Sequence, residues 1–147
     1  MKSIVLFLLG SLLLLGMADR TSAQDGVTVT VTVTNIPGAK GTLLVGLYDS
    51  EKSFLRNPHP NSPKIRLTST ANVTATIEDV KPGTYAVSVI QDLNGNGRLD
   101  KNLLGMPKEP LAFSVIGEIP RGRPKFGACS FTVEDRPVSM TISLVTE

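Results

Sequence analysis

The sequence predicts an all-β fold, a Greek-key β-sandwich of about seven strands, either Ig-like or prealbumin-like, that follows an N-terminal signal peptide. Two observations lead to this prediction. Short segments with alternating apolar and polar residues recur along the chain, separated by turn residues, which is typical of sandwiches. No segment shows the apolar period of about 3.6 residues over the length that a helix needs.

The first 23 residues have the three parts of a secretory signal peptide. Lys2 supplies the positive charge, residues 4–15 form an apolar core, and the small residues 21–23 suit a signal peptidase. The apolar core is shorter than the roughly 20 residues of a membrane-spanning helix. We therefore expect cleavage after Ala23, membrane contact only during export, and a mature protein in the periplasm or outside the cell.

Residues 24–147 are enough for one domain and hardly for two. Without Lys2, Arg20 and Asp19, the 15 basic and 13 acidic residues of the chain become 13 and 12. This balance argues against a nucleic-acid partner, and we interpret the cations of residues 121–125 as a solvated loop.

Because Cys129 is the only cysteine, no intramolecular disulfide can form, and we expect its thiol to be buried in a strand.

Four segments in the first half of the chain have strand patterns. They are residues 27–34, 42–48, 64–68 and 73–77. The Val and Leu content of the second segment indicates a central strand. The polar connection after it, 49–62, contains Phe54 and Leu55, which we expect to pin the connection to the core.

The second half begins with Pro82-Gly83, which predicts a turn with positive φ at the glycine before a strand that ends at Ile90. Two closing strands are predicted at 128–133 and 138–145, joined by a hairpin-like turn. The connection between residues 92 and 124 is long and rich in glycine and proline. Long connections of this kind often carry function, so we place the candidate site there.

The most distinctive part of this connection is the loop from residue 92 to residue 100. Oxygen-bearing side chains occupy its positions 1, 3, 5 and 9, and these are Asp92, Asn94, Asn96 and Asp100. With a glycine at position 6 this is the spacing of a calcium loop, in which Arg98 offers its backbone carbonyl. Position 12 is Leu103 instead of a bidentate glutamate, so a calcium site here is weak, with a Kd of about 10⁻⁴–10⁻³ M.

A structural interpretation of the same loop stays open. Asn94-Gly95 and Asn96-Gly97 both favour turns with positive φ, and the aspartates would then accept hydrogen bonds from backbone amides. Calcium is the one cofactor that the sequence suggests, and Glu109 is a further ligand that the sequence does not place near the loop. No catalytic residue is indicated, because His59 lies alone between two prolines and no nucleophile motif accompanies it.

These segments together resemble the DUF2141 family of exported bacterial proteins. The resemblance is carried by Gly46-Leu-Tyr-Asp-Ser50, Pro82-Gly-Thr-Tyr-Ala86, the loop 92–100, and Leu104-Gly-Met-Pro-Lys-Glu109. The last two are the most specific, since Pro-Gly-Thr-Tyr also occurs in transthyretin-like and carboxypeptidase-regulatory-like sandwiches. The chain departs from the family at Gln91, where members often have histidine. The resemblance implies the fold and the export, and no particular reaction or ligand.

The leading hypothesis for function is a non-catalytic binding or scaffold module with a protein or glycan partner. One alternative is a small carbohydrate-active or hydrolytic enzyme that uses carboxylates of residues 92–109. The other is a subunit of an envelope assembly. The sequence indicates no oligomeric state.

Overall fold

The computed structural model describes residues 25–118 and 122–146, so the predicted signal peptide lies outside the described residues. The described chain forms eight strands and one four-residue helix. They are β1 (Val27–Thr34), β2 (Thr42–Tyr48), β3 (Lys64–Arg66), β4 (Val73–Val80), β5 (Gly83–Asp92), β6 (Leu111–Phe113), α1 (Phe126–Cys129), β7 (Ser130–Val133) and β8 (Val138–Ser143). No helix in this part of the chain is long and apolar enough to cross a membrane.

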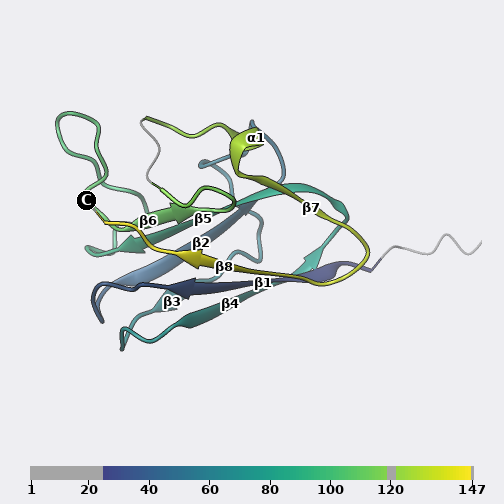
Figure 1. The fold of residues 1–147 in the computed structure, drawn as a ribbon, viewed down its shortest axis with the longest axis horizontal. Helices are drawn as coiled ribbons and strands as arrows, with labels where there is room; N and C mark the ends of the chain where they lie inside the picture. The colour runs from purple at the N-terminus through teal and green to yellow at the C-terminus, as the bar shows by residue number, and fades with distance from the viewer. Residues whose placement is uncertain (1–24, 119–121, 147) are drawn as a thin grey trace, which may run out of the picture.

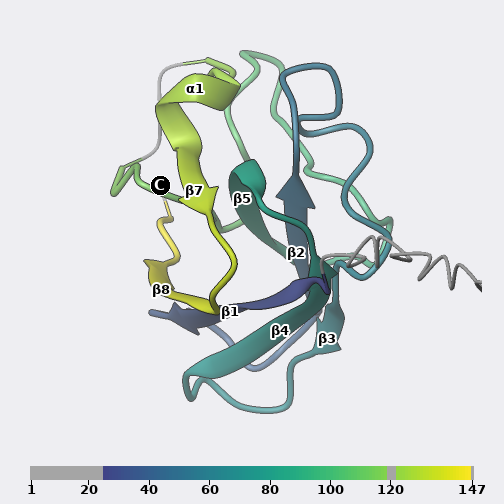
Figure 2. The same ribbon diagram turned by 90° about the vertical axis from the view of Figure 1, so that its right-hand side faces the viewer.

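The strands form two sheets that face one another (Figures 1 and 2). The smaller sheet has the order β4-β1-β8, and the larger has the order β3-β2-β5-β6. Strand β7 pairs with the first half of β5, on the edge that β6 occupies further along. The prediction of an all-β sandwich is confirmed, with one strand more than the seven that the sequence indicated.

Strand β1 shows why the two sheets pack together. Its threonine–valine alternation turns Val29, Val31 and Val33 to one face, where all three are fully buried. On the larger sheet, alternate residues of β2 and β5 meet them from the other side, including Val45 and Val87. Burial of these side chains away from water is the main stabilising contribution to the sandwich.

A second apolar cluster lies on the outer face of the larger sheet. Its buried members are Tyr48, Phe54, Ala86, Leu111, Phe113 and Cys129. The ring of Phe54 lies 5.4 Å from that of Tyr48, 6.3 Å from that of Phe113 and 5.9 Å from that of Phe126, measured between centroids. The expectation that Phe54 pins the connection 49–62 is confirmed, and so is the burial of Cys129.

Four local predictions are wrong. The connection 92–124 contains the short strand β6, whose three residues are too few to show an alternating pattern. The segment 128–133 starts within helix α1, so Cys129 ends a helix turn instead of lying in a strand. Residues 135–137 do not form a hairpin, because β7 pairs with β5 while β8 pairs with β1 in parallel in the other sheet. The positive φ falls at Asp79 and not at Gly83, which begins β5.

Candidate functional site

The predicted loop follows directly from the end of β5, where Asp92 is buried. The two oxygens of its carboxylate accept hydrogen bonds from the Gly95 and Gly97 backbone N–H groups, both at 2.7 Å. Both glycines have positive φ, 77° and 76°, as the Asn-Gly pairs predict. The Asp92 carboxylate therefore acts as a cap for two tight turns.

The remaining predicted ligands also bind one another. The Asp100 carboxylate accepts hydrogen bonds from the side-chain amides of Asn94 and Asn96, the latter at 2.9 Å. The side-chain oxygen of Asn94 accepts from the Asn96 N–H at 3.1 Å, and that of Asn96 accepts from the Arg98 N–H at 3.0 Å. The side-chain oxygens of the four predicted oxygen ligands are thus engaged in hydrogen bonds inside the loop, and Arg98 takes part through its backbone N–H.

Glu109 accepts hydrogen bonds from both ends of this loop, a contact that the sequence did not predict. Its buried carboxylate accepts the Leu93 N–H at 2.8 Å with one oxygen and the Asp100 N–H at 3.0 Å with the other. One side chain therefore ties the two ends of the loop together. Among the described residues, no three His, Cys, Asp or Glu side chains gather as they would around a metal ion.

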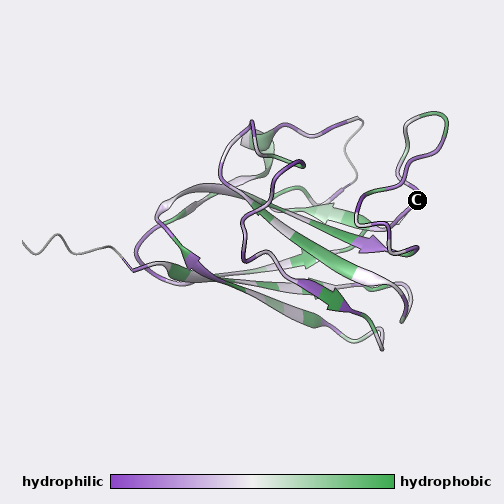
Figure 3. Ribbon diagram, turned by 180° about the vertical axis from the view of Figure 1, so that it is seen from behind, coloured by the Kyte–Doolittle hydropathy of each residue, from purple (hydrophilic) through white to green (hydrophobic). Residues whose placement is uncertain are grey.

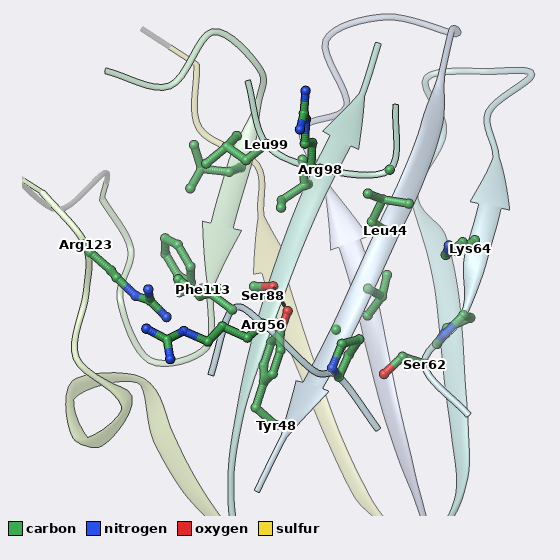
Figure 4. A pocket seen from close by; sticks show the side chains of 18 of the residues that line it. Leu44, Tyr48, Arg56, Ser62, Lys64, Ser88, Arg98, Leu99, Phe113 and Arg123 are labelled. Carbon is green, nitrogen blue, oxygen red and sulfur yellow. Dashed lines mark hydrogen bonds between the residues drawn. The ribbon is translucent and has the colours of Figure 1, made fainter. Parts of the chain in front are cut away.

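A cavity of about 540 Å³ opens beside the loop, on the outer face of the larger sheet (Figure 4). Apolar side chains form much of its wall, among them Leu44, Ile90, Leu99, Leu111 and Phe113. Five cationic side chains also line it: Arg56, Lys64, Arg98, Lys101 and Arg123. Within residues 25–118 and 122–146, no aspartate, glutamate or histidine is part of this lining.

The polar floor of the cavity is a pair of hydroxyl groups. The Tyr48 hydroxyl lies 3.2 Å from the Ser88 hydroxyl, and both residues are buried. A Cβ on Gly46 would come within 2.4 Å of the Tyr48 hydroxyl oxygen, so the glycine is what allows the tyrosine side chain to lie across β2. Burial raises the pKa of Tyr48, against the smaller opposing effects of the Ser88 hydrogen bond and the charge of Arg123. The phenol therefore stays protonated at neutral pH.

The cations of the cavity have no carboxylate partner in the described part of the chain. The ion pairs found there join Lys81 to Asp79 at the end of β4, and Arg136 to Glu134 between β7 and β8, all with exposed side chains. Figure 4 shows the side chains of Arg56 and Arg123 pointing toward one another beside Phe113. Several like charges around a concave surface with apolar walls produce a positive potential that attracts anions.

The cavity continues into an apolar extension of about 640 Å³. The two share the lining residues Leu55, Leu99, Lys101, Leu111, Phe113 and Arg123. Beyond them, the extension reaches Met106 and Val145. Arg123, which the sequence placed in a solvated loop, lines both cavities and donates a hydrogen bond to the Phe54 carbonyl. No sequence motif links the five cations, because they come from four separate segments, with Arg98 and Lys101 in the same one.

Comparison with known proteins gives a family and no activity. A family model described as an uncharacterized protein conserved in bacteria (DUF2141) matches residues 31–141, a range that holds the loop and all five cations of the cavity. No curated protein and no solved structure matches the chain.

Proposed function

This chain belongs to the DUF2141 family of uncharacterized bacterial proteins, and we propose that it is a non-catalytic binding module whose outer-face cavity takes an anion with an apolar part. One observation carries the proposal. Of the described residues, five cations and no carboxylate line a cavity whose walls include leucine, isoleucine and phenylalanine side chains. Such a lining attracts a negative group and at the same time offers apolar surface to the rest of the ligand.

The size and the chemistry of the cavity agree with a small molecule. A volume of about 540 Å³ lies within the range of about 300–1,000 Å³ that is typical of ligand sites. Arginine guanidinium groups bind carboxylate or phosphate through two parallel hydrogen bonds. We therefore place the anionic group between Arg56 and Arg123, and the apolar part against Leu99, Leu111 and Phe113.

Titration calorimetry with three probes tests this proposal. Octyl phosphate has both features, octyl glucoside has the chain without the charge, and inorganic phosphate has the charge without the chain. We expect octyl phosphate to bind, and each of the other two to bind at least about tenfold more weakly, a difference of about 1.4 kcal/mol. Equal binding of octyl glucoside and octyl phosphate, or no binding of either, would contradict the proposal.

A matched pair of variants locates the binding. Arg56→Gln removes one cation of the cavity, and we expect about tenfold weaker binding of octyl phosphate, since a charge-assisted hydrogen bond contributes about 1.5–3 kcal/mol. Arg136→Gln removes an exposed arginine that pairs with Glu134 outside the cavity, so binding should not change. Equal losses in the two variants would indicate attraction to the overall charge.

The hydrolase alternative needs two carboxylates of residues 92–109 in one pocket. The cationic cavity has none in its lining, and the carboxylates of Asp92 and Glu109 each hold two backbone N–H groups. These contacts favour binding over hydrolysis. A protein or glycan partner and a place in an envelope assembly are further proposals, which co-purification from the native cell envelope tests.

For the loop 92–100 we propose that its own hydrogen bonds hold it in shape. Calcium is the competing proposal, in which the ion displaces the amide groups of Asn94 and Asn96 from Asp100. Thermal unfolding with calcium or chelator separates the two, because a bound ion stabilises the folded state by mass action. A midpoint unchanged at millimolar calcium supports the first. A midpoint that rises in the wild type and not in Asp100→Asn supports calcium.

Export stays a proposal that rests on the sequence of residues 1–23. Mass spectrometry of the protein from the cell envelope or the medium tests it. A mature chain that begins at Gln24 is the expected result, and an intact N-terminus in the cytoplasm would contradict it.

A further inference from the structure

Residues 101–107 form a small hairpin, called the finger below, that stands away from the sandwich near the C-terminus (Figure 1). A β-bridge between Lys101 and Pro107 closes its base. The Asn102 N–H donates to the Met106 carbonyl at 2.8 Å, and the Asn102 side-chain oxygen accepts the N–H groups of Leu104 and Met106 at 2.9 and 3.0 Å. Gly105, with φ of 80°, makes the turn. These contacts fix the shape of the finger.

The tip of the finger is apolar and exposed. The exposed fraction is 106 % for Leu103, 87 % for Leu104 and 43 % for Met106. Figure 3 shows the hydrophobic colour gathered at the end of this loop, away from the body. Three apolar side chains held in water by a hydrogen-bonded turn are costly, and exposed apolar groups of this kind mark an interaction surface.

The exposed charged residues of the chain next to the finger in sequence carry one sign. The exposed charged residues between positions 93 and 108 are Arg98, Lys101 and Lys108, all cationic. The acidic side chains of the region, Asp92, Asp100 and Glu109, are at least partly buried and accept the hydrogen bonds described above. Apolar side chains with cations near them are the combination by which peripheral proteins bind anionic lipid surfaces, and here Lys101 and Lys108 flank the base of the finger.

We propose that the finger inserts Leu103, Leu104 and Met106 into the surface of an anionic lipid bilayer, with Lys101 and Lys108 at the lipid phosphates. A narrow projecting tip suits a fluid bilayer, which closes around it, whereas a stable protein partner needs a broad face of about 800 Å². This inference goes beyond the proposed function and does not rest on it. Met106 also lines the apolar extension of the cavity, so docking in this way places that cavity beside the membrane.

Tryptophan fluorescence tests the insertion directly. The sequence contains no tryptophan, so L104W introduces a single reporter at the tip. The experiment uses the chain from Gln24, which contains every strand of the fold. Vesicles of phosphatidylcholine with a minority of phosphatidylglycerol should shift the L104W emission to the blue. Vesicles of pure phosphatidylcholine should produce a smaller blue shift.

The matched control is V115W. Val115 is 74 % exposed and follows β6 at its opposite end from the finger, because Leu111 at the near end pairs with Ile90 and Phe113 with Ser88. Its emission should not shift. A blue shift of V115W equal to that of L104W, or no shift of either, overturns the proposal.

Vesicle co-sedimentation tests the same surface without a reporter. The double variant L103S/L104S should lower the partition coefficient on anionic vesicles at least about tenfold, given about 0.8 kcal/mol for each buried CH₂ group. K101Q/K108Q should lower it several-fold and reduce the preference for anionic lipid. A partition coefficient of L103S/L104S equal to that of the wild type overturns the proposal. The wild type could instead self-associate without vesicles, and L103S/L104S could abolish this. That result also overturns the proposal, because it means that the finger binds a second copy of this chain.

Discussion

The two faces of the larger sheet are built from the same strands but are covered differently. On the inner face, Val87 and Val89 of β5 are fully buried against the smaller sheet. On the outer face, Ser88 and Ile90 of the same strand line a cavity that loops cover only in part. The inner face is sealed by a second sheet, and the outer face is bordered by the connections that bring in Phe54 and Arg123. Sealing gives stability, and partial covering leaves room for a ligand.

Two neighbouring leucines of β2 lie on opposite faces of the larger sheet. Leu43 is fully buried in the inner core, and Leu44 lines the cavity. We expect Leu43→Ala to lower the free energy of unfolding by about 2–5 kcal/mol, because it leaves a void in a packed core. Leu44→Ala should cost less than about 1 kcal/mol, because its side chain borders a space that is already open. Urea denaturation measures both, and equal losses would mean that the outer face is packed like the inner one.

Substitution of Glu109, which accepts hydrogen bonds from both ends of the loop 92–100, should have the next largest effect. Glu109→Gln keeps one oxygen and replaces the other with an NH₂ group that faces a backbone donor. We expect a loss of about 1–3 kcal/mol in unfolding free energy, the cost of leaving a buried donor without a partner. The amides of Leu93 and Asp100 should exchange with solvent faster. Asp100→Asn is the control with a smaller expected loss, because that carboxylate accepts only exposed side-chain amides. A larger loss of unfolding free energy in Asp100→Asn than in Glu109→Gln would contradict this expectation.

A smaller effect is expected at high pH from Tyr48, on the floor of the cavity. Because burial raises its pKa above the ordinary value of 10.0, the unfolded chain loses this proton at a lower pH than the folded chain does. Folding stability should therefore fall as the pH rises through 10, and Tyr48→Phe should show a shallower fall. Urea midpoints of the two proteins between neutral and alkaline pH measure this difference. Parallel curves would mean that the hydroxyl is solvated in the folded protein.

The Val and Leu content of residues 42–48 predicted the central strand β2, and the Pro82-Gly83 turn signal preceded β5. The alternation of apolar and polar residues predicted β1, which has one face in the core. It did not predict β6, which is buried on both sides and only three residues long. The loop 92–100 was recognised from its spacing, and its positive-φ glycines were predicted. Its partner Glu109 was not placed, because a side chain that caps a distant loop leaves no periodic pattern in the sequence.

The sequence did not predict the cavity, for a related reason. Alternation indicates that Leu44 and Ser88 lie on the face opposite to Leu43 and Val87, and it says nothing of what covers that face. Arg56, Arg98 and Arg123 reach the cavity from three connections whose paths are set by tertiary packing. One local signal was present: Gly46, two residues before Tyr48 in an otherwise apolar strand, marks the place where a side chain lies across the strand.

We propose that the outer face of the larger sheet binds an anionic, partly apolar molecule and that the inner face does not. Methyl NMR spectra recorded during a titration with octyl phosphate test this claim residue by residue. We predict saturable shifts for the methyl groups of Leu44, Ile90 and Leu99, and none for those of Leu43 and Val89. Spectra that do not change, or shifts as large at Leu43 as at its neighbour Leu44, would contradict the claim.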